Sequence, residues 1–280
     1  MTNSIGKIVN INKDIYTVRE NNNVFSLSVR GKLKDIKLTV GDNVEFNKET
    51  KTIEKVLERK NTLERPLISN IDKLFIVCSN KVPSFSTYLL DKFLVLTEVN
   101  NIKPIIIITK MDLLSYKEKI ELKRTLSYYE KLGYKVYKNT EVHKIKKEMK
   151  NNVVAVAGQT GAGKSTLLNI IDKNLNLETG EVSKALGRGK HTTRLVSLIY
   201  TNKSLIADTP GFSALDLSLT KEEIKKGFIE FNIDCKYKSC MHTKEEGCKV
   251  IERVNNNKIL KSRYENYIKL ISEAKNESKW

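Results

Sequence analysis

Short stretches in which apolar and polar residues alternate fill the beginning of the chain, between residues 5 and 46. The runs YTV and FSLSV alternate in this way, and the turn pair Gly41-Asp42 separates KLTV from NVEF. Alternation with a period of two is typical of strands that bury one face, and turn residues between such runs indicate hairpins. The pattern predicts a small antiparallel barrel at the N-terminus.

A different pattern begins near residue 71, where wholly apolar runs alternate with longer helical stretches. The runs LFIVCS, PIIIIT and VVAVA are apolar apart from a final Ser or Thr in the first two, as strands buried on both faces are. Between the last two, the stretch SYKEKIELKRTLSYYEKLG has helical character and stops at Gly133. Strands and helices in alternation predict a parallel α/β sheet.

The pattern changes a second time after DTPG at 208–211. Thr220 and Glu223 have the spacing of a capping box, which predicts the start of a helix. An amphipathic helix is predicted over about 257–275, with one apolar stripe formed by Leu260, Tyr264, Tyr267 and Ile271. We therefore expect three domains, with the bounds 1–65, 66–219 and 220–280.

Composition and charge narrow the functional classes. The 280 residues are 40% hydrophobic and 30% charged, as in globular proteins. No signal-like segment opens the sequence and no apolar run approaches the ~18 residues of a membrane span, so we expect a cytoplasmic protein with no membrane contact. The net charge of +17 favours a polyanionic partner such as nucleic acid, although a generally basic, solvated surface is the alternative.

A complete phosphate-binding motif, G-x4-G-K-[ST], lies between an apolar run and the helical TLLNII. Its glycines allow backbone N–H groups to wrap phosphates, Lys164 can reach the β- and γ-phosphates, and the Ser165 hydroxyl can ligate Mg²⁺. The nucleotide-binding residues predicted here are Gly158, Gln159, Thr160, Gly161, Ala162, Gly163, Lys164, Ser165 and Thr166.

The tetrapeptide Thr109-Lys110-Met111-Asp112 matches the guanine-reading signature [NT]-K-x-D and ends an apolar run. The Asp112 carboxylate can accept hydrogen bonds from N1 and N2 of guanine, whereas adenine offers no such donor pair. The stem of Lys110 can cover the ring. Thr109, Lys110 and Asp112 are therefore predicted to bind the base of GTP.

Two further segments are predicted to contact Mg²⁺ and the γ-phosphate. In DTPG, Asp208 would lie near the metal and Gly211 would offer its N–H to the γ-phosphate. The loop GRGKHTTR at 187–194 has the glycines, basic residues and threonines of a switch segment. Thr193 is predicted to meet Mg²⁺, with Thr192 as the alternative.

The base reader precedes the phosphate loop, which reverses the order found in ordinary GTPases. The termini of a doubly wound sheet often lie close together, so joining them and cutting elsewhere keeps the same strands in space. The reversed order therefore predicts a circularly permuted G domain.

Three cysteines and one histidine have the spacing C-x4-C-x-H-x5-C near the C-terminus. The candidate ligands are Cys235, Cys240, His242 and Cys248. Three thiolates and an imidazole form a closed tetrahedral set that suits one structural zinc ion rather than a catalytic one. Because this segment shows little apolar core of its own, we expect the metal to contribute to its folding. Cys78 is interpreted as a buried strand residue, and His143 as a surface residue.

Over almost its full length the chain resembles the bacterial small-ribosomal-subunit-dependent GTPase family (RsgA). The matching segments occur in the family's order: a linker like RKNTLERP at 59–66, TKMD, GQTGAGKST, RGKHTT, DTPGF and the Cys/His spacing. The resemblance implies an N-terminal OB-fold, a permuted P-loop G domain and an α-helical zinc domain. It also implies GTP, GDP, the small ribosomal subunit and its rRNA as partners, Mg²⁺ with GTP as cofactor, and hydrolysis stimulated by the subunit during its late maturation. We expect a monomer.

Two departures from the family pattern keep alternatives open. Thr109 replaces the commoner Asn, and the loop around 138–141 lacks the Ser-Ala pair that usually lies near guanine O6. A P-loop ATPase or small-molecule kinase is one alternative. An RNA-binding assembly factor that holds GTP as a structural ligand is another.

The residue after D-x-x-G, where many GTPases have a glutamine that orients water, is Phe212. Another group must position the water, and His191 in the switch loop is the nearest candidate by sequence; the family resemblance also suggests a role for it. His191 and Lys164 are therefore the predicted catalytic residues. The alternative is that His191 touches RNA or only shapes its loop.

Overall fold

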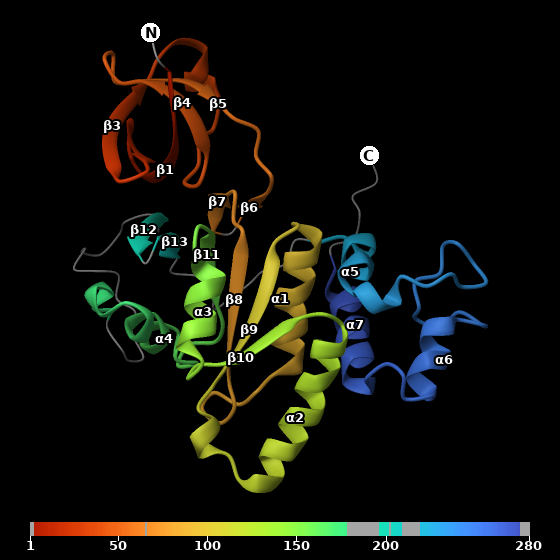
Figure 1. Cartoon of the computed structure of the whole chain (residues 1–280). Helices are drawn as coiled ribbons and strands as arrows, with labels where there is room; N and C mark the ends of the chain where they lie inside the picture. Colours follow the sequence, from red (N-terminus) through yellow and green to blue (C-terminus); the bar gives the residue numbers. More distant parts are fainter. Residues whose placement is uncertain (1–2, 65, 178–195, 202, 209–218, 275–280) are drawn as a thin grey trace. The chain divides into compact units, whose positions relative to one another are not determined.

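The computed structural model describes residues 3–64, 66–177, 196–201, 203–208 and 219–274 (Figure 1). The chain divides into two compact units. One consists of Met1–Phe75, Glu141–Ala157 and Gly163–Leu215, and the other of Ile76–Thr140, Gly158–Ala162 and Asp216–Trp280. The three domains predicted from the sequence pattern stay a prediction.

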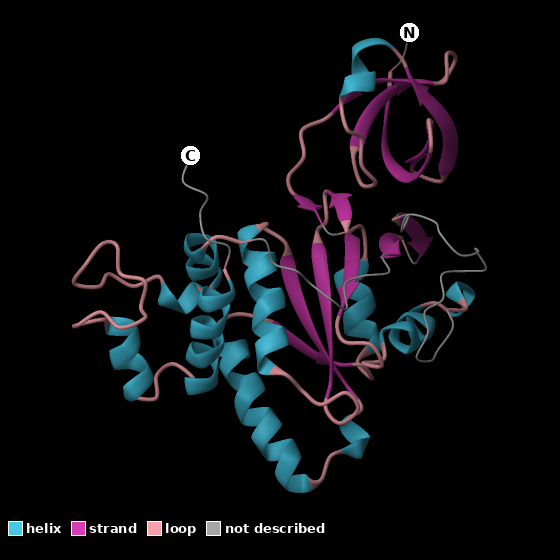
Figure 2. Ribbon diagram, turned by 180° about the vertical axis from the view of Figure 1, so that it is seen from behind, coloured by secondary structure: helices cyan, strands magenta, loops and turns pink. Residues whose placement is uncertain are grey.

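The first part of the chain forms a closed barrel with the strand order β1-β2-β3-β5-β4. Its strands are β1 (Ser4–Asn12), β2 (Ile15–Glu20), β3 (Asn23–Val29), β4 (Asn43–Asn47) and β5 (Thr52–Val56). One parallel pair, β3 with β5, closes the otherwise antiparallel barrel. Alternate side chains fill it, among them Ile8, Val18, Leu27, Val44, Phe46 and Ile53. The predicted barrel is confirmed, and its strands are drawn in magenta in Figure 2.

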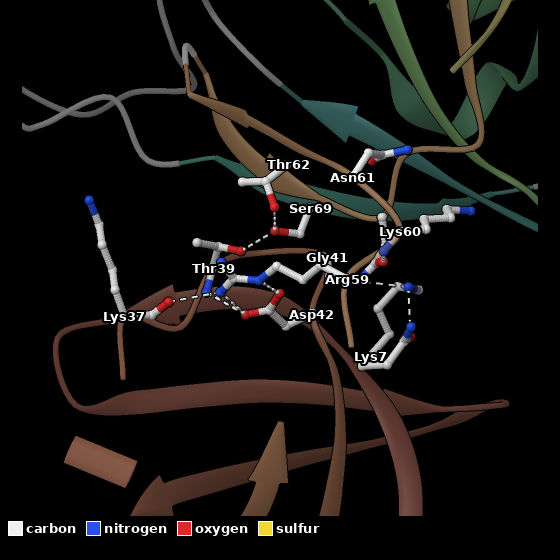
Figure 3. Close-up of polar contacts among 12 residues, drawn as sticks. Lys7, Lys37, Thr39, Gly41, Asp42, Arg59, Lys60, Asn61, Thr62 and Ser69 are labelled. Carbon is white, nitrogen blue, oxygen red and sulfur yellow. Dashed lines mark hydrogen bonds and ion pairs between the residues drawn. The ribbon is translucent and has the colours of Figure 1, made fainter. Parts of the chain in front are cut away.

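A turn of the barrel is bound tightly to the segment that follows it (Figure 3). Arg59 binds Asp42, which is fully buried, through Nε at 2.7 Å and Nη2 at 2.8 Å. Beside this pair, a Cβ on Gly41 would lie 2.0 Å from the Ser69 carbonyl oxygen, so the close approach requires glycine. Ser69 ends the hairpin formed by β6 (Thr62–Glu64) and β7 (Leu67–Ser69).

A six-stranded sheet has the strand order β10-β9-β8-β11-β13-β12. Its strands are β8 (Lys73–Ser79), β9 (Lys103–Thr109), β10 (Lys135–Lys138), β11 (Val153–Ala157), β12 (Ser197–Thr201) and β13 (Ser204–Asp208). The pairs β9–β10 and β11–β13 are parallel, and β12 pairs antiparallel with β13. Every residue of β11 is buried, as its unbroken apolar run predicts.

The helices between these strands are α1 (Thr87–Val99), α2 (Tyr116–Lys131), α3 (Val142–Met149) and α4 (Lys164–Ile171). The helix predicted before Gly133 is α2. It begins at a capping box formed by Ser115 and Glu118, and Gly133 follows it with φ of +96°. Among the described residues, no helix has the length and apolarity needed to cross a bilayer.

The C-terminal helices are α5 (Lys221–Gly227), α6 (Lys249–Asn255) and α7 (Lys261–Glu273), with a 3-10 turn at Ile229–Phe231. The predicted capping box of Thr220 and Glu223 is present at the start of α5. The helix expected to begin near 257 begins only at Lys261. Asn257 has φ of +56° and Leu260 is extended, so helical hydrogen bonding cannot start before 261.

A buried arginine joins α7 to α1 and to the 3-10 turn. The Arg263 side chain, 0% exposed, binds Asp91 through Nη1 at 2.6 Å and Glu230 through Nε at 2.6 Å. Tyr129 of α2 donates to the same Asp91 carboxylate at 2.7 Å, and Asn266 donates to its other oxygen at 2.6 Å. Although burial alone lowers it, the two carboxylates hold the pKa of Arg263 well above its usual value. The guanidinium therefore stays charged inside the core.

We predict that Arg263→Ala lowers the free energy of unfolding by about 3–5 kcal/mol, because it leaves a buried carboxylate without its partner. Urea unfolding followed by circular dichroism measures the change. The control is Arg253→Ala, on the exposed face of α6, which should shift stability by no more than about 0.5 kcal/mol. Equal stabilities of the two variants would show that the buried pair contributes little.

Candidate functional site

The phosphate loop has the backbone that its glycines predict. Gly158, Gly161 and Gly163 have φ of +140°, +78° and +93°, values that other residues rarely adopt. The N–H of Ala162 donates to the Gln159 carbonyl at 3.1 Å, which curls the loop before α4 begins. Backbone N–H groups in such a loop and at a helix start can bind phosphate oxygens.

The end of β8 packs closely against this loop. A Cβ on Gly158 would lie 2.2 Å from the Val77 carbonyl oxygen, so only glycine allows the loop to approach β8 this closely. A Cβ on Gly161 would lie 3.6 Å from Cδ of Pro83, in ordinary contact. Residues 77–83 therefore pass beside the phosphate loop.

The two polar side chains of the motif open α4. Lys164 and Ser165 are its first residues and both are half-buried, whereas Thr166 and Thr160 are exposed. Burial lowers the pKa of Lys164 from its usual value. A phosphate near its ammonium group would favour the charged form again, because it replaces the lost solvation.

The predicted base reader contacts the phosphate loop directly. Thr109 ends β9, is 3% exposed, and its hydroxyl donates to the Ala162 carbonyl at 2.7 Å. The Thr109 hydroxyl therefore links the base motif to the phosphate loop. The structure thus brings together two segments that are 53 residues apart in the chain.

The rest of the base motif lies in a short 3-10 turn at Met111–Leu113. Lys110 precedes the turn in the left-handed conformation, with φ of +55°, and its ammonium group donates to the Val82 carbonyl. Asp112 is exposed, as a carboxylate that meets a ligand must be. The N–H of Asn139 donates to the Ile108 carbonyl oxygen at 2.9 Å, so the loop after β10 lies beside this motif.

Several predicted residues fall outside the described part of the chain: His191, Thr192, Thr193, Gly211 and Phe212. Asp208 ends β13 and pairs with Ser197 of β12, so the strand expected before DTPG is present. The roles assigned to these residues stay predictions.

The four predicted metal ligands lie together in the C-terminal part. The Nδ1 atom of His242 is 3.4 Å from Sγ of Cys240 and of Cys248, and 3.6 Å from Sγ of Cys235. All four candidate ligand atoms lie within 4.8 Å of one another. Ligands at about 2.0–2.3 Å from a tetrahedral metal lie roughly 3.3–3.8 Å apart. The three nitrogen–sulfur distances fall in this range, so the cluster fits a four-coordinate metal ion.

Neighbouring side chains fix the loop that holds this cluster. The Glu245 carboxylate accepts hydrogen bonds from the N–H groups of Met241 and Thr243, at 2.7 and 2.8 Å. Although burial raises it, backbone hydrogen bonds lower the pKa of Glu245 to about 2. The Tyr264 hydroxyl donates to the His242 carbonyl at 2.8 Å. The fourth cysteine, Cys78, lies in β8 outside the cluster, and burial raises the pKa of its thiol to about 12.

Sequence reasoning missed the part played by residues 77–83. This segment has no motif, and it contacts the phosphate loop and the base reader over long distances in the sequence. The unusual glycine at Gly158 was the one signal, because a strand followed by an obligatory glycine indicates close approach of another backbone.

Comparisons with known proteins agree with this arrangement. The sequence model of the family described as RsgA GTPase matches residues 54–218. The small ribosomal subunit biogenesis GTPase RsgA of Malacoplasma penetrans is 46% identical over 263 residues, covering 90% of this chain and 92% of the relative. The protein of the same name from Halalkalibacterium halodurans is 42% identical and covers 98% of both chains.

Two solved structures share the fold. The crystal structure of YjeQ from Thermotoga maritima has a TM-score of 0.84 and 33% identity, over 97% of this chain and 98% of that one. YloQ, described as a circularly permuted GTPase, has a TM-score of 0.83 and 33% identity, over 100% of this chain and 97% of that one. The predicted permutation of the G domain is confirmed. With its barrel, its permuted P-loop domain and its Cys/His cluster, this chain belongs to the RsgA GTPase family.

Proposed function

We propose that this protein is a GTPase that binds the small ribosomal subunit and acts in its late maturation, with hydrolysis stimulated by the subunit and coupled to release. The observation that carries the proposal is the 2.7 Å hydrogen bond from Thr109 to Ala162. It joins a loop suited to phosphates with a loop suited to guanine, as binding of one nucleotide requires. The names of the relatives support the ribosomal part of the proposal.

Each motif then has a chemical role toward GTP. The backbone N–H groups of 158–166 bind the phosphates, and Lys164 neutralises charge that develops between the β- and γ-phosphates during bond cleavage. Asp112 accepts hydrogen bonds from the guanine ring, and Lys110 covers it. Ser165, Asp208 and Thr193 would hold Mg²⁺, which screens the phosphate charge when bound.

Hydrolysis needs a group that orients the attacking water. Phe212 cannot do so, because its side chain neither donates nor accepts a hydrogen bond. His191 is proposed for this task, and the small subunit would stimulate hydrolysis by acting on the switch loop that contains it. Activators that complete a GTPase site in trans accelerate hydrolysis by up to ~10⁵-fold in other systems.

The net charge of +17 supports contact with rRNA, through phosphates and exposed bases on the barrel and the C-terminal region. Chain order suggests how the nucleotide state reaches that contact. DTPG ends at Gly211, and α5 begins at Lys221. Gly211 would contact the γ-phosphate, and a movement of this residue can be transmitted to α5 through the few residues between them.

We predict that free protein hydrolyses GTP slowly, that purified small subunits accelerate it, and that His191→Ala loses most of the accelerated rate while keeping GTP and subunit affinity. Single-turnover hydrolysis with and without subunits is the measurement. His143→Ala, an exposed histidine on α3, is the matched control and should behave as wild type.

The outcomes separate this proposal from its rivals. An unchanged single-turnover rate in His191→Ala removes that residue from the mechanism. If subunits fail to stimulate wild-type turnover, the protein is better described as an assembly factor with a structural GTP. If ATP competes with GTP equally, the guanine-reading role is wrong.

The metal of the Cys/His cluster is proposed to be one structural zinc ion. Three thiolates and one imidazole are the ligand set that zinc favours, and the four ligands leave no position for a reacting water. Zinc in such sites contributes folding free energy, because the ligands do not form the site in the unfolded chain.

We predict about one zinc per chain in the purified protein, and that Cys240→Ser loses the metal and unfolds at a lower temperature. Elemental analysis and thermal unfolding are the measurements. Cys78→Ser is the control, because this cysteine lies outside the cluster, and it should keep the full zinc content. A metal-free protein whose α5–α7 region is fully folded would refute the assignment.

A further inference from the structure

Asn80, the residue after β8, makes an unexpected contact with the base reader. Its side-chain Nδ2 donates to the Thr109 carbonyl oxygen at 2.9 Å. The same nitrogen lies 3.3 Å from the thioether sulfur of Met111. One half-buried amide therefore contacts both residues that flank Lys110.

This contact fixes a strained point in the backbone. Lys110 adopts φ of +55°, and residues other than glycine reach this left-handed region only at a cost in free energy. The Thr109 carbonyl belongs to the peptide that connects Thr109 to Lys110. A donor on that carbonyl holds the plane of the peptide, and so holds the direction in which Lys110 and Asp112 leave the strand.

The amide oxygen of Asn80 indicates that this side chain is present for the hydrogen bond to Thr109 and not for packing. Its Oδ1 is buried and has no hydrogen-bond partner among the described residues. A buried, unpaired amide oxygen costs stability, so an apolar side chain of similar size would serve better if packing were the only need.

Position 109 explains why an amide is required nearby. Where the commoner motif has Asn, this chain has Thr109, whose hydroxyl is engaged with the Ala162 carbonyl. That hydroxyl has a single proton, and it has no further donor for the base loop. Asn80 brings an amide to the same loop from the neighbouring strand.

We propose that Asn80 is a positioning residue for guanine recognition, supplying from β8 the amide that position 109 lacks; this rests on the proposed binding of guanine by the TKMD motif. Val82 supports the same conclusion, because its carbonyl accepts a hydrogen bond from the Lys110 ammonium group. The segment after β8 thus holds the base reader at two points, one on its backbone and one on its lysine.

The experiment compares GDP with ADP, using full-length protein and competition binding. Asn80→Ala should weaken GDP binding about tenfold, mainly through faster dissociation, and leave ADP binding unchanged, because the phosphate loop is intact. The GDP/ADP preference then falls by the same factor. Asn80→Asp keeps the shape of the side chain, but its carboxylate cannot donate to the Thr109 carbonyl. This variant should therefore lose the GDP/ADP preference to the same extent as Asn80→Ala.

Asn100→Ala is the matched control. Asn100 is also half-buried and also donates through Nδ2 to a backbone carbonyl, that of Leu96, at 2.9 Å, but it lies at the end of α1. This variant should lose some thermal stability and keep the full GDP/ADP preference. Melting temperatures of all variants separate loss of stability from loss of selectivity.

A second arm tests compensation. In a Thr109→Asn background an amide stands at position 109, so Asn80→Ala should cost clearly less GDP affinity than it does in the wild type. An equal cost in both backgrounds overturns the proposal, as does wild-type selectivity in Asn80→Asp. If the wild type itself binds ADP as tightly as GDP, then guanine recognition by TKMD has failed, and the proposed function fails with it.

Discussion

The hydrogen bond between the Thr109 hydroxyl and the Ala162 carbonyl is the contact on which the proposed nucleotide site depends. It spans 2.7 Å and joins the last residue of β9 to the loop that follows β11. Loops that follow parallel strands meet at the same edge of a sheet, so their order in the chain does not matter to the ligand. A permuted chain can therefore keep the site if the strands keep their neighbours. The tight approach of Gly158 to Val77 serves this end, because it seats the phosphate loop on β8.

The C-terminal part combines polar ties with a substantial apolar core. The sequence suggested little core there, but Phe228, Phe231, Tyr267 and Leu270 are almost fully buried. The Phe231 ring meets the His242 ring edge-on, with centroids 5.9 Å apart. The metal cluster is thus built against aromatic packing, and Arg263 joins the same core to α1. We expect metal loss to destabilise this region, while the apolar core and the Arg263 ion pair continue to stabilise its fold.

Local patterns predicted most of the elements, the backbone of the phosphate loop and the Cys/His cluster. The glycines of the phosphate loop, the Cys/His spacing and the capping box at Thr220 depend on neighbours within a few residues, so they can be read from the sequence. Asn80 and Arg263 could not be found this way. Arg263 pairs with Asp91, 172 residues away, and Asn80, directly after the neighbouring strand, donates to Thr109, 29 residues away. Such pairs produce no periodic pattern in the sequence. The late start of α7 depends on the backbone conformations of Asn257 and Leu260, which the hydrophobic pattern does not predict.

The proposed recognition of guanine by Asp112 can be tested by giving this side chain a hydrogen-bond donor. Guanine presents an N1 hydrogen and an amino group at C2, whereas xanthine has a carbonyl at C2. Asp112→Asn replaces an acceptor by a group that can donate to that carbonyl. Competition binding of the diphosphates should show a wild type that prefers GDP and a variant that prefers the xanthosine nucleotide. If both proteins keep the same order of preference, the base is read elsewhere, and the TKMD motif is not part of the site.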